Sequence, residues 1–310
     1  MKQAASAGAR GSQPVFSAVA LALATVSSVC AGAVGCARHE DVPAPTPHPT
    51  SAAVHAAAAI PSGPGQVAAL PAKTNPSLAC LARLYGVTVT PDGAGLRVPS
   101  STGTVIPWDD GRRKTEEERL ETPDLHDLFL APYPSHAMPD GNGGPTSTGD
   151  PGRIRVYALL DARYGAPGPA LEKKLVTVPF VDTRVRVHPL VAPVLTAVEN
   201  RLKLAIAKDQ KLLKFLHNLG GTYNDRAIAG TDRKSAHAYG IAIDLSVPES
   251  AYWRSTPRFS NRFPKEIIDA FESEGFIWGG RWAHFDTMHF EYRPEFFDES
   301  CTPSSRTDRH

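Results

Sequence analysis

The chain has 310 residues, with 33 Lys and Arg against 32 Asp and Glu, so its formal net charge is +1. This balance excludes the strongly basic surface typical of nucleic-acid binders, and we expect no nucleic-acid partner. A hydrophobic content of 42% is enough for a core, whereas 28 prolines and 25 glycines are more than usual and indicate that part of the chain is linker.

Residues 1–35 have the pattern of a secretory signal. Lys2 and Arg10 are the only charges before Arg38, and a long apolar run follows them. The letters AGA at 31–33 suit ordinary release, while AVGC at 33–36 resembles a bacterial lipobox in which Cys36 would be acylated. The lipobox is the favoured interpretation and soluble secretion the second, although the run is also long enough to remain as a membrane anchor. We therefore expect export to the periplasm or cell envelope, with a lipid anchor.

Residues 36–75 are rich in Pro and Ala and predict a disordered tether, because they contain too few large apolar side chains to form a core. Residues 76–170 predict an N-terminal extension. It begins with short strand-like runs at 86–91, 95–100 and 104–111, continues with a helical stretch at 115–130, and regains apolar periodicity at 153–165. These patterns contain no motif that assigns the extension a role.

Two of the four cysteines belong to the N-terminal region, since Cys30 lies within the signal and Cys36 is the lipidation candidate. Cys80 and Cys301 remain. In an oxidising compartment they can pair as a disulfide, and the alternative is two buried free thiols.

Residues 189–218 predict two helices. Val191, Leu195, Val198 and Leu202 recur near helical spacing. The Gly pair at 220–221 predicts a C-terminal cap for the second helix.

Residues 241–247 predict a strand that presents a carboxylate. Ile241, Ile243 and Leu245 alternate with smaller or polar residues, so Asp244 faces away from the aliphatic side chains. An unpaired buried charge is costly, and Asp244 therefore needs a partner. His237 lies seven residues earlier, and the intervening Tyr239–Gly240 turn can redirect it toward Asp244.

Residues 288–292 predict a second strand, on which His289 and Glu291 share one face, and Asp286 lies just before it. Together, His237, Asp244 and His289 are a common catalytic zinc set, which leaves the fourth position open for water. Asp286 is then a candidate general base, and Arg226 a candidate for stabilising an oxyanion. The alternative from spacing alone is a core histidine, a paired aspartate and a strand-end histidine.

Two motifs in the same order resemble a known family. SAHAYGIAID at 235–244 and DTMHFE at 286–291 are similar to the zinc D-alanyl-D-alanine carboxypeptidase and L-alanyl-D-glutamate endopeptidase family, the LAS-type cell-wall metallopeptidases. Ser235 opens the first motif. GFIWGGRW at 275–282 and the upstream Arg226 resemble the endolysin-like branch, and the resemblance extends over roughly residues 170–297.

The resemblance implies one Zn²⁺ ion as cofactor, with His237, Asp244 and His289 as its ligands. Asp286 would take a proton from the attacking water and return it to the leaving amine. Arg226 would polarise the scissile carbonyl or bind a substrate carboxylate, and Ser235 would contact the substrate or support the site.

The remaining polar and aromatic residues of the two motifs have less specific expectations. Tyr239 and Trp278 are candidates for substrate contact, with a core or cleft-wall position as the alternative. Glu291 is expected to be ion-paired or to support a ligand, and His284 to lie in a loop. Arg281 and Arg293 are expected to be surface charges.

The sequence therefore predicts an α+β fold whose small antiparallel sheet carries the zinc site, flanked by helices, with a peptidase domain at 171–297 and a tail at 298–310. We expect a monomer that hydrolyses stem peptides of its partner, peptidoglycan. Asp286 in place of Glu, and no Trp beside His289, favour an L-Ala–D-Glu-type endopeptidase. The alternatives are a D-Ala–D-Ala carboxypeptidase and a non-catalytic, metal-containing wall-binding module.

Overall fold

The structure is a computed structural model that describes residues 70–71, 74–99, 103–135, 149–228, 230–256 and 258–302. The predicted signal, most of the predicted tether and the lipidation candidate Cys36 lie outside these residues. Among the helices that are described, none has the length and apolarity needed to cross a bilayer.

The N-terminal described part begins with helix α1 (Pro76–Tyr85), where the Asn75 side chain caps the first turn by accepting a hydrogen bond from the Ser77 amide. The helix ends at Gly86, whose φ of 68° suits glycine. Strands β1 (Thr88–Val89), β2 (Gly95–Arg97) and β3 (Val105–Pro107) then form an antiparallel sheet in that order. Each strand lies within one of the predicted strand-like runs.

The predicted helical stretch at 115–130 is two short helices. Helix α2 (Glu116–Glu121) starts at a capping box formed by Thr115 and Glu118. It ends before Pro123, because a residue that precedes proline disfavours the helical conformation. The 3₁₀ helix η1 (His126–Phe129) follows, and helix α3 (Tyr157–Tyr164) lies within the predicted periodic segment at 153–165.

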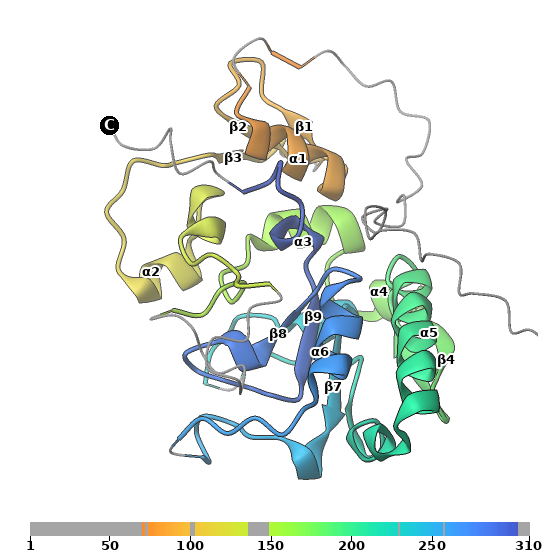
Figure 1. Ribbon diagram of the computed structural model, residues 1–310. Helices are drawn as coiled ribbons and strands as arrows, with labels where there is room; N and C mark the ends of the chain where they lie inside the picture. Colours follow the sequence, from red (N-terminus) through yellow and green to blue (C-terminus); the bar gives the residue numbers. More distant parts are fainter. Residues whose placement is uncertain are drawn as a thin grey trace, which may run out of the picture. The chain divides into compact units, whose positions relative to one another are not determined.

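The middle of the chain supplies the helix that supports the main sheet. After α4 (Pro169–Glu172), strands β4 (Val176–Phe180) and β5 (Thr183–Val187) form a hairpin. Helix α5 (Ala192–Lys208) buries Leu195, Val198 and Leu202, which confirms the predicted helix. It contacts both β4 and α6 (Lys265–Glu272), and α6 in turn contacts strand β8 (Phe276–Trp278) (Figure 1).

The main sheet is antiparallel and has the strand order β6-β7-β9-β8. Strand β6 comprises Leu219–Gly221, β7 Ala242–Ser246 and β9 His289–Tyr292. Four 3₁₀ helices connect or flank these strands, namely η3 (Ala236–Tyr239), η4 (Val247–Glu249), η5 (Gly279–Arg281) and η6 (Pro294–Phe296); the 3₁₀ helix η2 (Gln210–Phe215) precedes β6. Mixed helices and small antiparallel sheets confirm the α+β prediction.

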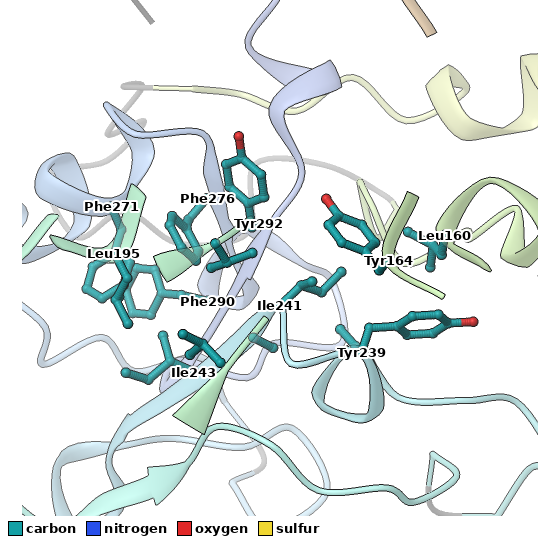
Figure 2. Close-up of a cluster of buried hydrophobic side chains, with 14 of the residues drawn as sticks. Leu160, Tyr164, Leu195, Tyr239, Ile241, Ile243, Phe271, Phe276, Phe290 and Tyr292 are labelled. Carbon is teal, nitrogen blue, oxygen red and sulfur yellow. The ribbon is translucent and has the colours of Figure 1, made fainter. Parts of the chain in front are cut away.

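The two faces of this sheet differ in chemistry. Ile243 and Phe290 are cross-strand partners on one face, where Phe271 of α6 and Leu195 of α5 pack with them (Figure 2). Because side chains alternate along a strand, Asp244, His289 and Glu291 lie on the other face. One apolar face therefore holds the sheet against the helices and leaves the other face for polar groups.

The Gly pair at 220–221 does not cap a helix as predicted, and this expectation was wrong. Helix η2 ends earlier, Asn218 takes a positive φ of 53°, and the glycines belong to β6. A Cβ atom at Gly220 would lie 2.7 Å from the Cβ of Asp244. Glycine is thus needed where β6 passes the Asp244 side chain.

The predicted extension at 76–170 shares a hydrophobic core with the sheet. The cluster of buried apolar residues runs from Leu78 of α1 to Cys301 near the last described residue. Cys80 and Cys301 form a disulfide, with 5.0 Å between their Cα atoms, and the Tyr85 hydroxyl donates to Glu295 at 2.8 Å. The extension therefore packs against the end of the chain that follows β9.

Candidate metal centre

His237 lies on the single turn of η3, and local hydrogen bonds fix its position. Ser235 caps the turn by accepting from the His237 amide at 3.3 Å, and Gly240 ends it with a φ of 68°. The His237 Nδ1 atom lies 2.5 Å from the Thr222 carbonyl oxygen. Because a carbonyl can only accept, Nδ1 carries the proton and the lone pair of Nε2 points to the other side of the ring.

Asp244 and His289 are direct cross-strand partners of β7 and β9. The Asp244 Oδ1 atom lies 2.9 Å from His289 Nδ1 and 3.2 Å from His237 Nε2, and the two ring nitrogens are 3.2 Å apart. All three side chains are buried. The structure thus brings together the three residues that the sequence predicted as ligands.

The spacing of these three atoms suits a small cation. Zinc binds imidazole and carboxylate at about 2.0–2.1 Å in a tetrahedron, whose edges are then about 3.3 Å long. The three observed separations, 2.9 to 3.2 Å, are close to these edges. Within the described part of the chain, His237, Asp244 and His289 form a group that could hold a metal ion.

Glu291 contacts the ring nitrogen of His289 that faces away from Asp244. Its Oε2 atom lies 3.3 Å from His289 Nε2, so this ring nitrogen donates to the carboxylate while Nδ1 faces Asp244. Burial alone would raise the pKa of Glu291, but Arg155 keeps that pKa well below its usual range. A ring nitrogen bonded to a carboxylate or a carbonyl is the usual arrangement of a histidine ligand. The expectation that Glu291 is ion-paired is confirmed.

The electrostatics of the group favour a positive charge. Burial would raise the pKa of Asp244, yet hydrogen bonds with His237 and His289 lower it below its ordinary value. For His289, burial opposes protonation, but the Asp244 and Glu291 carboxylates outweigh it and raise the pKa to about 9. A bound cation would take the place of that proton.

Asp286 precedes β9 and lies close enough to His289, Asp244 and His237 for their charges to affect its pKa. Burial raises the pKa of Asp286 to about 6. Its Oδ1 atom is buried and has no hydrogen-bond partner among the described residues. A carboxylate oxygen left unpaired beside a cation site is suited to accept a proton from water.

Arg226 and Ser235 are neighbours across a short hairpin but differ in exposure. The Ser235 amide donates to the Arg226 carbonyl at 3.2 Å, and the Ser235 side chain is buried as the cap of η3. The Arg226 side chain is exposed. The packing of Ser235 favours support of His237, and its roles and those of Arg226 toward a substrate stay predictions.

Tyr239 and Trp278 are both buried. The Tyr239 hydroxyl donates to Asp161 at 2.7 Å, and Figure 2 shows the residue near Leu160 and Tyr164 of α3. The Trp278 indole N–H donates to the Thr287 carbonyl at 2.8 Å. Their packing favours the core position that was the alternative to substrate contact.

Two arginines were expected on the surface, and the structure contradicts this. Arg281 and Arg293 are 0% and 1% exposed. Arg281 pairs with Glu272, and Arg293 pairs with Glu291 and Glu295. Buried arginines of this kind persist because a carboxylate matches the guanidinium fork. His284, expected in a loop, lies in one and contacts Asp150, with 2.8 Å between Nδ1 and Oδ2.

Sequence reasoning missed the partners that orient the histidines. Thr222 acts through its backbone carbonyl, which any residue type would supply, so no sequence signal marks it. Arg155 lies 136 residues before Glu291, outside both motifs. Arg155 is one of three arginines in the periodic segment 153–165, so its sequence position alone does not single it out.

A second acidic group, formed by Asp109, Asp110 and Asp124, was also close enough to hold a cation. The Lys114 ammonium already lies 2.7 Å from Asp124 and 2.8 Å from both Asp110 and Asp127. This group is therefore an internal ion-pair cluster, and it differs from the His237 group, in which a single carboxylate meets two imidazoles.

A family model described as D-alanyl-D-alanine carboxypeptidase matches residues 229–292. This range contains His237, Asp244, Asp286 and His289, and it ends within β9. The match supports a hydrolytic peptidase that acts on peptidoglycan, in agreement with the family resemblance of the two motifs. No solved structure was found to match the chain.

Proposed function

We propose that the chain is a zinc-dependent peptidase that hydrolyses peptidoglycan stem peptides. One observation carries the proposal. Within the range matched by the peptidase family, His237 Nε2, Asp244 Oδ1 and His289 Nδ1 converge at zinc-ligand spacing. The nearby Oδ1 atom of Asp286 has no hydrogen-bond partner among the described residues.

His237, Asp244 and His289 would hold the ion. When bound, zinc supplies Lewis-acid chemistry, because it polarises a carbonyl and makes water more acidic. Asp286 accepts a proton from the attacking water and delivers it to the leaving amine. The Thr222 carbonyl and the Glu291 carboxylate keep the two imidazoles oriented during this transfer. The exposed Arg226 is the candidate for contacting a substrate carboxylate or the developing oxyanion.

The D-Ala–D-Ala bond is the first candidate for the bond that is cleaved, because the matching family model carries that activity in its description. The L-Ala–D-Glu bond is the second. Two residues favour this second candidate: Asp286 stands where many carboxypeptidase relatives have Glu, and Met288 rather than Trp precedes His289. The same two residues, with GFIWGGRW, support placing the chain in the endolysin-like branch.

Digestion of purified peptidoglycan by the full chain, followed by mass spectrometry of the products, tests the proposal. Release of free D-Ala identifies a carboxypeptidase, and new N-terminal D-Glu identifies an endopeptidase. An Asp286→Asn variant that keeps zinc is the control for contaminating hydrolases. A zinc-loaded wild type that releases nothing would favour the wall-binding module.

Export and lipid anchoring at Cys36 belong to the same proposal. The Cys80–Cys301 disulfide supports it, because such bonds persist in oxidising compartments. Membrane fractionation of wild type and a Cys36→Ala variant tests the anchor. A variant that stays in the membrane fraction would exclude lipidation at Cys36 as the anchor. Sedimentation of the detergent-solubilised protein tests the expected monomer.

A further inference from the structure

Arg155 is a buried cation that belongs neither to the two sequence motifs nor to the range matched by the family model. It lies just before α3 and is 6% exposed. Its Nε atom donates to Glu291 Oε1 at 2.9 Å, and a terminal guanidinium nitrogen donates to Glu291 Oε2. The pair is therefore bidentate, which fixes both the position and the plane of the carboxylate.

Among the described residues, the hydrogen-bond partners of Glu291 Oε2 are this arginine and a metal-ligand candidate. Oε2 accepts from Arg155 and from His289 Nε2, while Oε1 accepts from Arg155 and, at 3.2 Å, from Arg293. Glu291 is 0% exposed, so water cannot replace a lost partner without a change in packing. Arg155 thus determines how the carboxylate is presented to His289.

The residues before and after Arg155 are also held in place by hydrogen bonds to the peptidase-like part of the chain. The Pro151 carbonyl accepts from the Trp282 indole at 2.7 Å, and the Gly152 carbonyl accepts from Arg293 at 2.7 Å. Gly152 has a φ of 84°, and a Cβ there would lie 2.3 Å from Ile277 Cδ1. The Tyr157 hydroxyl donates to the Lys234 carbonyl at 3.0 Å, just before η3. These contacts hold the segment at one place on the sheet.

We propose that Arg155 is a positioning residue for the metal centre, acting on His289 through Glu291. The proposal rests on the proposed function only in assuming that His237, Asp244 and His289 bind a cation. It assigns a purpose to part of the predicted extension, since residues 149–157 would complete a centre whose ligands all lie in the matched range.

The mechanism depends on orientation and charge together. An ionised carboxylate held in one plane keeps the Nε2 proton of His289 directed at Oε2, which leaves Nδ1 as the only nitrogen that can face Asp244. Without Arg155, Glu291 keeps only the contact of Oε1 with Arg293 besides its contact with His289, and its carboxylate can rotate. The imidazole would then lose its fixed orientation, and loss of such a supporting partner usually weakens metal binding by about 10- to 100-fold.

The experiment measures metal affinity in the full chain, independently of peptidase activity. Zinc dissociation constants are obtained by competition with a chromophoric chelator, and the visible spectrum of the cobalt-loaded protein reports ligand geometry. The variants are Arg155→Met, Arg155→Lys and Glu291→Gln. Glu199→Gln is the matched control, because Glu199 is also a buried, ion-paired glutamate but bonds to Val181 and Lys203.

We expect zinc affinity to fall about 10- to 100-fold in Arg155→Met and Glu291→Gln, with an altered cobalt spectrum. Arg155→Lys should be intermediate, because it keeps the charge but not the fork. Glu199→Gln should lower the unfolding temperature without changing either metal readout. Folded Arg155→Met protein with wild-type affinity and spectrum would overturn the proposal.

If Arg155→Met does not fold, Arg155→Lys and Glu291→Gln decide by the same two readouts, and unchanged values in both overturn the proposal. A wild type that binds no zinc overturns both this inference and the proposed function. A wild type that binds zinc in an Arg155-dependent manner but cleaves no peptidoglycan supports the inference and contradicts the peptidase proposal alone.

Discussion

The Cys80–Cys301 disulfide joins residues 221 positions apart, so its removal should strongly destabilise the folded chain. In the chain-entropy description, closing a loop of this length removes about 18 cal/mol/K from the unfolded state, or about 5 kcal/mol at 25 °C. For a domain of this size, about 2–4 °C of unfolding temperature corresponds to each kcal/mol. We therefore expect reduction to lower the unfolding temperature by about 10–20 °C.

The location of the bond explains why the loss should be felt by the whole fold. Cys80 lies on α1 and is 3% exposed, and Cys301 follows η6 and is 0% exposed. Helix α1 contacts η6 and α3, so an undocked α1 would expose part of the core shared with the main sheet. When the bond is reduced, the conformational entropy of the unfolded chain rises, while the folded chain keeps the same packing contacts. The free energy of unfolding therefore falls.

Thermal unfolding followed by far-ultraviolet circular dichroism checks this, with oxidised wild type, wild type in reductant and a Cys80→Ala/Cys301→Ala variant. The reduced wild type keeps both sulfur atoms, so it isolates the cross-link from the cavity that the alanines create. A reduced wild type that unfolds within about 2 °C of the oxidised protein would refute the loop-entropy reasoning.

Three further predictions concern the site and its surroundings. His237→Ala should lose stoichiometric zinc by metal analysis, and full retention would remove it as a ligand. Asp286→Asn should keep zinc and lower peptidoglycan hydrolysis by about 10²- to 10⁴-fold, and undiminished turnover would exclude it as the base. Burial lowers the pKa of His188 to about 4 and outweighs the hydrogen bond with the Tyr164 carbonyl, which raises it. Between about pH 6.5 and pH 4 the unfolded chain binds a proton that the folded chain does not, so stability falls as the pH falls, by at most about 3 kcal/mol. Denaturant unfolding between about pH 6.5 and pH 4 should show that the free energy of unfolding falls more in wild type than in His188→Gln. Equal pH dependence in the two proteins would contradict the prediction.

Local pattern was enough to predict the two strands that carry Asp244 and His289. The alternation around Asp244 and the glycine at 240 describe a strand and the turn before it, and both depend only on neighbouring residues. His289 and Glu291 share a face for the same reason. The three ligand candidates could therefore be named before any long-range contact was known.

The supporting contacts could not be predicted, because they depend on packing between distant segments. Arg281 and Arg293 were assigned to the surface from the general tendency of charged residues, and each is buried only because a glutamate meets it. Arg155 and Glu291 are 136 residues apart in sequence, with helices α3 to α6 between them. The Gly pair at 220–221 was misassigned because the side chain that requires it, Asp244, is on another strand.

The direct pairing of Asp244 with His289 has a consequence for how the sheet forms. A slip of one residue between β7 and β9 would turn His289 to the apolar face and would bring a phenylalanine or a methionine opposite Asp244. A cation that needs both side chains would thus bind only the correctly aligned strands. At a thousand times its dissociation constant, such a ligand adds about 4 kcal/mol to the native state. A bound cation would therefore favour the observed alignment of β7 and β9 over the slipped one.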